Sequence, residues 1–290
     1  MSDLWNVLQL VDENGDVAFD FGESEPDAVV TDFDPGFPAV RAVSNNRVNG
    51  SGTVDTTKYF GSRGVTMTVS LDPAKPSQSL SWQKRLLQLC LPDRRPYLYL
   101  QTIEDPMVWR MLLVGSQVTA PYQVVLAPQL AWTNPDGTWE AAVETERTIF
   151  PGNGPTGGRT YPKTYPWSYS PGTPPGSGII EVAGTVPTPP VIRIYGPVTG
   201  PAITNATTGQ TIAFKSSYTV PSGGYVSINC NDLISPVLAN DDPSLSRMNQ
   251  INFTTNRFWF LQPGENQIQF TGTALGGITQ AVISWRERTA

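Results

Sequence analysis

The sequence predicts a mainly β protein made of two β-sandwich-type domains. Short runs of β-branched and aromatic residues alternate with turn signals, among them 26 glycines and 27 prolines in 290 residues, and this spacing is typical of sandwiches and barrels. Only one segment has the period of an amphipathic helix. Charged residues make up 15% of the chain, below the roughly 25% of an average globular protein. The length suits about two domains of roughly 150 residues each.

The chain opens with a predicted β-hairpin over residues 4–21. Asn14 and Gly15 separate two apolar runs and accept the positive φ angles of a tight hairpin turn. The alternative, a calcium-binding loop, needs glycine at its sixth position, where this chain has Val17. The ligands of such a loop would be Asp12, Asn14, Asp16 and Glu23. We therefore expect the hairpin.

A long Gly/Asn-rich loop follows, from Asn45 to Gly52. Loops of this length are uncommon in compact domains unless they bind something. Asn45 and Asn49 are accordingly candidate contacts to another subunit or domain.

The first domain also contains the chain's one convincing helix. Arg63–Leu71 alternates apolar and polar residues and predicts a half-buried strand. Residues 77–91 follow the helical period through Trp82 and Leu86, and Pro92 stops them. One amphipathic helix among many strands must cover a face of a sheet, so we expect it to pack there.

Further strands complete a first domain over residues 1–148. We expect strands at 96–102 and 107–114, and then a two-stranded ribbon formed by 122–132 and 138–144 around the turn at 134–137.

Residues 149–184 are predicted to be a linker or arm. Between 151 and 178 half of the residues are Gly or Pro, which neither a helix nor a ladder tolerates. Two interpretations stand: a disordered tether, or an arm whose aromatic rings anchor it on its own domain or on a neighbouring chain. The candidate anchors are Tyr161, Tyr165, Trp167 and Tyr169.

Residues 185–290 predict a second sandwich, a galectin-like jelly roll. Val191–Tyr195 follows a Pro-rich lead and is interpreted as an edge strand. Alternation along later strands fits two sheets packed face to face. The further strands are expected at 210–215, 225–229, 257–261, 266–272 and 280–286.

The residue inventory excludes most catalytic chemistry. The chain has no histidine, which removes Ser-His-Asp and Cys-His catalysis and the commonest zinc and iron ligand sets. No Gly-rich phosphate loop is present, so we expect no cofactor and no metal. Two carboxylate pairs, Glu144 with Glu146 and Asp241 with Asp242, keep glycoside hydrolysis open as an alternative. Exposed aromatics such as Trp259 would serve sugar binding, although a Phe-Trp-Phe strand favours core packing.

The net charge of the chain limits the kinds of partner that we expect. A net charge of −6 argues against tight binding to a phosphate backbone, which needs several Lys or Arg on one face.

Cys90 and Cys230 are predicted to be two buried thiols, not a bridge. The first ten residues lack the features of a signal peptide, and no apolar run approaches the roughly 18 residues that span a membrane. We expect synthesis in a cytoplasm and no membrane insertion.

The second half contains an ordered series of strand and turn segments, which closes with Leu261, Pro263-Gly264, Asn266 and the apolar strand at Ile268. The segments are Pro189–Gly196, Pro201–Asn205, Thr208–Ile212, Val220–Ile228 and Phe258–Asn266. In this order they resemble the distal tail protein family of long, non-contractile-tailed bacteriophages. The first half is similar more loosely, through a β-domain with one helix. Residues 151–178 have no counterpart in that family.

The resemblance implies a structural virion protein and no enzyme. Members form a hexameric ring at the distal end of the tail, join the tail tube to the tip or baseplate hub, and leave a channel for DNA. Their outward carboxy-terminal domains serve in some cases as platforms for receptor-binding proteins or bind host saccharides. The alternative from another class is an extracellular module that binds or cleaves carbohydrate.

Overall fold

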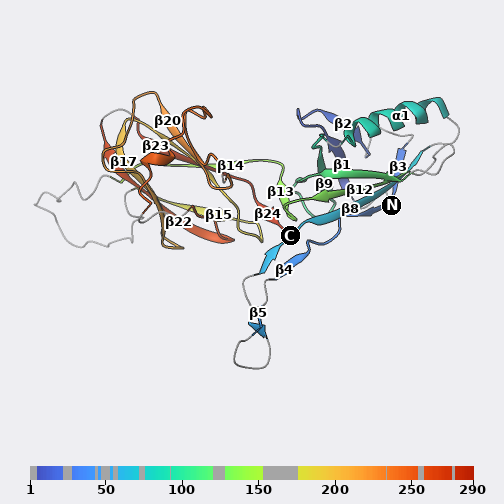
Figure 1. Ribbon diagram of the computed structural model, residues 1–290, viewed down its shortest axis with the longest axis horizontal. Helices are drawn as coiled ribbons and strands as arrows, with labels where there is room; N and C mark the ends of the chain where they lie inside the picture. The colour runs from blue at the N-terminus through green and yellow to red at the C-terminus, as the bar shows by residue number, and fades with distance from the viewer. Residues whose placement is uncertain are drawn as a thin grey trace, which may run out of the picture. The chain divides into compact units, whose positions relative to one another are not determined.

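The computed structural model describes residues 5–21, 28–42, 45–46, 53–54, 58–71, 76–91, 93–119, 128–152, 176–232, 234–253, 258–275 and 278–290. The chain divides into two compact units (Figure 1). The amino-terminal unit comprises residues 1–143 and 288–290, and the carboxy-terminal unit comprises residues 144–287. The chain therefore passes from one unit to the other twice.

The described residues of the amino-terminal unit form two main sheets, one helix and two small hairpin sheets. Their order is β2-β1-β9-β10-β13-β24 in one main sheet and β11-β12-β8-β3 in the other, with β4-β7 and β5-β6 as separate pairs. The elements are β1 Trp5–Val11, β2 Val17–Asp20, β3 Ala28–Asp34, β4 Val40–Ala42, β5 Asn45–Asn46, β6 Thr53–Val54, β7 Lys58–Phe60, β8 Arg63–Leu71, α1 Pro76–Leu89, β9 Tyr97–Thr102, β10 Trp109–Leu112, β11 Val114–Thr119, β12 Gln129–Asn134, β13 Trp139–Ala141 and β24 Arg288–Thr289.

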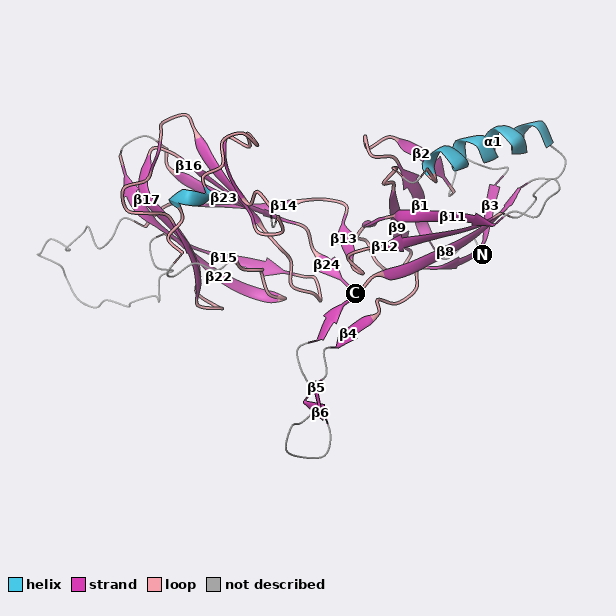
Figure 2. Cartoon of the chain, in the orientation of Figure 1, coloured by secondary structure: helices cyan, strands magenta, loops and turns pink. Residues whose placement is uncertain are grey.

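The predicted hairpin, strand and helix of this unit are confirmed. β1 pairs antiparallel with β2 across the turn that contains Gly15, whose φ is 90°. Alternate residues of β8, among them Val65 and Met67, are buried and face the core that both main sheets share. Trp82 and Leu86 of α1 add to that core, and the Trp82 ring centroid lies 4.6 Å from that of Phe19. Figure 2 shows α1 beside β2.

The expected ribbon of 122–132 with 138–144 is wrong. β12 pairs with β8 and β11, whereas β13 pairs with β10 and β24. The turn between them therefore moves the chain from one main sheet to the other. Asn134 holds this turn, because its Oδ1 accepts from Gly137 N at 2.6 Å and its Nδ2 donates to Thr138 O at 3.3 Å. A turn signal predicts a reversal, but the pairing partner is decided by packing.

The carboxy-terminal unit is a sandwich of two five-stranded sheets. Their orders are β14-β23-β16-β20-β21 and β15-β22-β17-β18, with β19 on β17. The elements are β14 Thr145–Ile149, β15 Ser177–Val182, β16 Val191–Tyr195, β17 Val198–Asn205, β18 Gln210–Ala213, β19 Thr219–Val220, β20 Tyr225–Asn229, β21 Val237–Ala239, the 3-10 turn η1 Met248–Gln250, β22 Gly264–Ala274 and β23 Gln280–Trp285. The predicted mainly β class, with one α-helix among the described residues, is thus confirmed.

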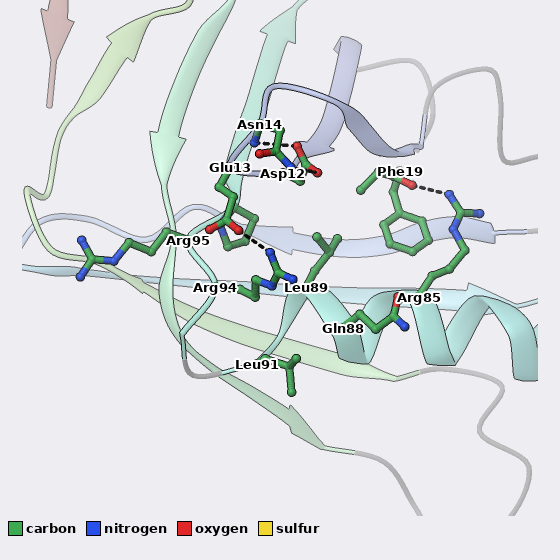
Figure 3. A pocket seen from close by; sticks show the side chains of 12 residues that line it. Asp12, Glu13, Asn14, Phe19, Arg85, Gln88, Leu89, Leu91, Arg94 and Arg95 are labelled. Carbon is green, nitrogen blue, oxygen red and sulfur yellow. Dashed lines mark hydrogen bonds and ion pairs between the residues drawn. The ribbon is translucent and has the colours of Figure 1, made fainter.

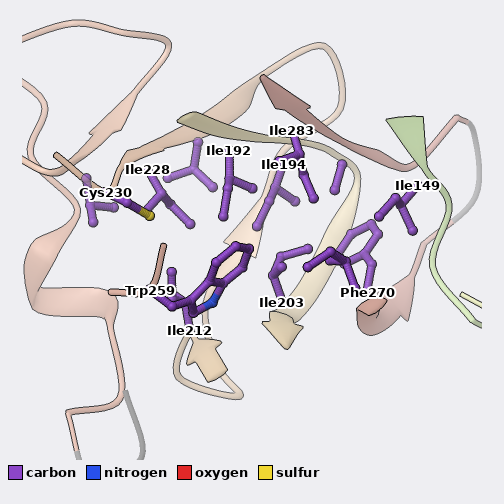
Figure 4. Close-up of a cluster of buried hydrophobic side chains, with 14 of the residues drawn as sticks. Ile149, Ile192, Ile194, Ile203, Ile212, Ile228, Cys230, Trp259, Phe270 and Ile283 are labelled. Carbon is purple, nitrogen blue, oxygen red and sulfur yellow. The ribbon is translucent and has the colours of Figure 1, made fainter. Parts of the chain in front are cut away.

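One apolar core lies between these two sheets (Figure 4). Ile192 and Ile283 enter it from one sheet, and Ile203 and Phe270 enter it from the other. Trp259 fills the middle with 1% of its surface exposed. Burial of such side chains at roughly 1.5–3 kcal/mol each is the main force that holds the sheets together.

Three expectations for this unit are corrected. β16 is a central strand with partners on both sides, not an edge, because the prolines lie before its ladder begins. Residues 258–260 do not form a strand, and Leu261 makes only a single β-bridge, to Thr188. Trp259 is therefore not held in a ladder, and its side chain is buried in the core. β14, assigned above to the first domain, pairs with β23 in this unit.

Candidate functional site

The candidate contact residues predicted from the sequence fall mainly outside the described residues. Asn49 and the four aromatic candidates of the arm, Tyr161, Tyr165, Trp167 and Tyr169, lie there. Asn45 is described in its backbone, where it begins β5 opposite Val54. The predicted contacts of these residues therefore stay predictions.

In the described part of the segment that carries Asn45, four short strands pair only with one another and not with either main sheet. β4 pairs with β7, and β5 pairs with β6, both antiparallel. Figure 1 shows β4 and β5 leading away from the main sheets of their unit. Short hairpins of this kind are not independently stable in water, so contact with another surface would stabilise this one.

Exposed apolar side chains surround the base of this hairpin. Phe37 is 92% exposed, Val40 63% and Phe60 45%. Val40 and Phe60 are directly paired across β4 and β7. Clustered exposed apolar groups mark interaction sites on soluble proteins, and we call Phe37, Val40 and Phe60 the hairpin-base surface.

The amino-terminal unit also has a pocket of about 490 Å³ (Figure 3). It lies between the β1–β2 turn and the last turns of α1, and Glu13, Gln88 and Leu91 are among the residues that line it. Arg94 is paired with Glu13 across the pocket. Arg85 donates to Ala18 O and lies over the Phe19 ring, 4.6 Å from its centroid.

The charged groups of this pocket serve the fold. Asp12 accepts the backbone N–H groups of Asn14 and Asp16, each at 2.9 Å. These bonds, above all that from Asp16, hold the pKa of Asp12 below its usual value, so the carboxyl stays ionised and does not supply a proton. Asp12, Asn14 and Asp16 thus close a hairpin turn, as the sequence favoured, whereas Glu23 lies outside the described residues. Within the described residues, no three His, Cys, Asp or Glu side chains gather as a metal site.

The carboxylate pairs considered for glycoside hydrolysis are not arranged as acid and base. Glu144 lies 3.6 Å from Arg286, and Glu146 is exposed on β14 opposite Ser284. Asp242 accepts from the backbone and hydroxyl of Ser244 at 2.8 and 2.7 Å. Each carboxylate therefore has a local partner or faces solvent.

Sequence reasoning missed a polar and aromatic cluster on the outer face of β16 and β20. Tyr195 and Tyr225 are opposite each other, with ring centroids 5.2 Å apart. Asp241, two residues beyond β21, accepts from Tyr225 Oη at 2.8 Å and from Arg193 Nε at 3.3 Å. Alternation along β16 does signal that Arg193 and Tyr195 share its outer face, but the cross-strand partner is set only by the sheet order.

Among the described residues, no helix is long and apolar enough to cross a membrane.

Cys90 and Cys230 are both free thiols, and Cys230 is buried while Cys90 is half-buried. The prediction of two free thiols is confirmed, whereas the prediction that both are buried is correct only for Cys230.

Comparison with known proteins gives a family for the carboxy-terminal unit. Residues 183–288 match the family described as "Siphovirus-type tail component, C-terminal domain". A search of curated protein sequences found no match.

Comparison with solved structures extends the likeness to the whole chain. The Dit protein of phage SPP1, titled "a Paradigm of Hub Adsorption Apparatus in Gram-positive Infecting Phages", superimposes with a TM-score of 0.59 at 11% identity, over 98% of this chain and 99% of that chain. A chain of the phage P2 baseplate in its activated conformation with Ca gives 0.50 at 13% identity, over 97% and 98%. The same baseplate with Sr gives 0.50 at 14%, over 96% and 97%. At these identities the structural likeness shows the fold.

The family match covers the unit whose strand and turn segments carry the resemblance seen in the sequence, and the whole-chain fold agrees with it. Residues 183–288 are thus similar to the siphovirus-type tail component family, in agreement with the resemblance to distal tail proteins that the sequence carries.

Proposed function

We propose that this protein is a structural virion protein that forms a ring at the distal end of a phage tail. The observation that carries the proposal is the family match of the carboxy-terminal domain, joined to a fold that follows the SPP1 Dit protein over nearly the full length of both chains. In this proposal the ring is a homohexamer, joins the tail tube to the tip or baseplate hub, and leaves an axial channel through which DNA passes.

The amino-terminal unit is proposed to build the ring and the carboxy-terminal unit to decorate it. A closed ring needs two different, complementary surfaces on each subunit. The amino-terminal unit offers the β4–β7 hairpin and the hairpin-base surface for this purpose. By contrast, the edge strand β14 of the other unit exposes Glu146 and Arg147, and charges on an edge discourage pairing with another chain.

The proposed partners follow from this arrangement. They are further copies of the chain, the tail tube protein and the tip or hub protein, with receptor-binding proteins or host saccharide on the outer domain. The net charge of −6 suits a channel that does not retain DNA, because a basic lining would hold the phosphates.

We also propose that the aromatic residues of the arm anchor it in the assembled particle, so that limited proteolysis after Lys163 and Tyr165 is slow there. Rapid cleavage at these positions would identify the arm as a tether.

The ring is tested by measuring the mass of the concentrated full-length protein by light scattering. The wild type should form a closed oligomer of six chains. Phe37→Ser combined with Phe60→Ser should shift the mass toward the monomer, because the substitutions place hydroxyls on the hairpin-base surface. Ile234→Ser is the matched control: Ile234 is 93% exposed in the carboxy-terminal unit, and its substitution should leave the oligomer intact. A wild-type protein that stays monomeric would contradict self-assembly.

A further inference from the structure

The pocket beside the end of α1 contains one charged side chain without a partner (Figure 3). Asp12 closes the β1–β2 turn, and Glu13 pairs with Arg94. Arg85 donates to a backbone carbonyl of β2. Arg95 also lines the pocket, but it is exposed and has no ion-pair or hydrogen-bond partner among the described residues. Figure 3 shows its guanidinium extending away from the Glu13–Arg94 pair, so Arg95 is available to a ligand.

The charged side chains of the pocket favour an anionic ligand. Its lining combines three arginines with two acidic residues, so one positive charge is in excess; these residues are Arg85, Arg94, Arg95, Asp12 and Glu13. The excess is local, since the whole chain has a net charge of −6. The carbonyl end of a helix favours cations beside it. This effect accounts for an arginine at the end of α1, but it leaves the charge of Arg95 without a counter-ion.

The rest of the lining is largely apolar and partly open to solvent. Phe19, Leu89 and Pro96 belong to it, and Leu91 lines the pocket while 48% of its surface is exposed. Leu87, four residues earlier on α1, is 52% exposed. Grouped exposed apolar side chains mark interaction sites, and the helix dipole does not account for them. The volume of about 490 Å³ also lies within the range of roughly 300–1,000 Å³ that is typical of ligand sites.

We propose that this pocket is a docking site for an acidic, amphipathic peptide segment of a partner protein. An apolar side chain of the segment packs against Leu89 and Leu91, and a neighbouring carboxylate pairs with the guanidinium of Arg95, whose forked N–H groups match a carboxylate. The positive excess selects an acidic segment over a basic one, and the exposed leucines select a peptide with apolar side chains over a small inorganic anion. The site goes beyond the ring proposed above, because α1 and the strands β4 and β5 lie on different sides of their unit (Figure 1).

A mere packing gap at the end of a helix would bind nothing, so binding is measured directly on the full-length protein by fluorescence polarisation. The probes are short labelled peptides in which leucines are set among glutamates at different spacings. Matched peptides carry glutamine or lysine in place of glutamate, or serine in place of leucine, and unlabelled inorganic phosphate is the competitor. At least one acidic leucine peptide should bind at least about threefold more tightly than its matched peptides, as an exposed ion pair allows. Its affinity should fall as the salt concentration rises from about 0.05 M to about 0.5 M, because salt screens exposed charges.

Variants place the peptide in the pocket. Arg95→Gln and Leu91→Ser should each lower the affinity at least about threefold, and Arg95→Gln should also reduce the salt dependence. Arg147→Gln and Leu275→Ser are the matched controls, because both residues are exposed in the carboxy-terminal unit, and each should leave the affinity within about twofold. Circular dichroism checks that every variant stays folded.

Three results would each overturn the proposal: no binding by any acidic leucine peptide, equal binding of the glutamine or lysine peptides, or an affinity that neither Arg95→Gln nor Leu91→Ser changes. Displacement of the bound peptide by phosphate at an equal concentration would likewise overturn it, since a simple anion site would then explain the binding. The oligomer mass does not enter this test, so the ring and the docking site can fail separately.

Discussion

Asn205 and Asn266 form a buried amide pair in the carboxy-terminal unit, with Asn205 Nδ2 donating to Asn266 Oδ1 at 3.2 Å and both side chains wholly inaccessible. Asn266 also spans its own turn, because its Nδ2 donates to Gln262 O at 2.7 Å and its Oδ1 accepts from Gln262 N at 2.9 Å. Asn205 Oδ1 accepts from Thr207 N at 3.1 Å. Both asparagines belong to segments that carry the family resemblance, and here they close turns.

Asn266→Ala should destabilise the carboxy-terminal unit substantially. The substitution removes the side-chain partners of the Gln262 N–H and C=O groups and of Asn205 Nδ2, and each unsatisfied buried group costs about 1–3 kcal/mol. Urea unfolding followed by circular dichroism measures the effect. Asn231→Ala is the control, because Asn231 is exposed. Equal stability of the two variants would show that the buried network contributes little.

Trp259→Ala should cost about 3–5 kcal/mol, the range for removing a large aromatic from a core. Trp259→Phe should cost clearly less, since it keeps most of the apolar volume and removes a buried indole N–H that has no partner among the described residues. Thermal unfolding of both variants tests this. A phenylalanine variant as unstable as the alanine variant would mean that the indole shape, not apolar burial, is decisive.

The thiols should be unreactive in the native protein. Burial raises the pKa of Cys230 to about 12, and burial also raises the pKa of Cys90. The thiolate is the reactive form, so Ellman's reagent at about pH 8 should label Cys230 only after unfolding. Because the native pKa of Cys230 exceeds the unfolded value of 9.0, its contribution to stability is complete below that pH and is lost as the pH rises toward about 12. The Cys90→Ser variant isolates Cys230, and rapid native labelling of that variant would contradict its burial.

Replacing residues 154–174 with a short Gly/Ser linker should leave the sandwich folded. Both sides of this segment reach one residue: Gly152 N donates to Phe270 O at 3.0 Å, and Phe270 N donates to Gly176 O at 2.7 Å. The ends are thus held together by the core itself, and loop length changes the closure entropy only slowly. The melting temperature of the full-length variant should stay within a few degrees. A large drop would show that the segment packs on its own domain.

Removing residues 288–290 should weaken the amino-terminal unit and spare the other. Those residues include β24, which pairs with β13, and Arg288 lies 3.3 Å from Glu140 and 3.7 Å from Asp136. Hydrogen exchange should accelerate at Trp139 and Glu140 in β13, where a buried edge becomes solvated, while the amides of β16 keep their protection. Faster exchange in β16 instead would contradict this assignment.

Local chemistry in the sequence determined the mainly β class, the hairpin around Gly15, the helix and five of the ten described strands of the second sandwich. It also excluded histidine-based catalysis, and the ordered turn segments indicated the family. These signals are local because alternation, caps and turn residues report the backbone angles and the face of a strand within a few residues.

Only the tertiary structure decided which strands are neighbours. It placed β14 in the carboxy-terminal unit and β24 in the amino-terminal unit, made β16 central, and brought Asp241 to Arg193 and Tyr225. The alternation of apolar and polar residues along a strand does not depend on which strand lies beside it. The neighbouring strand in the sheet is therefore decided by how the buried faces of distant segments pack into one core.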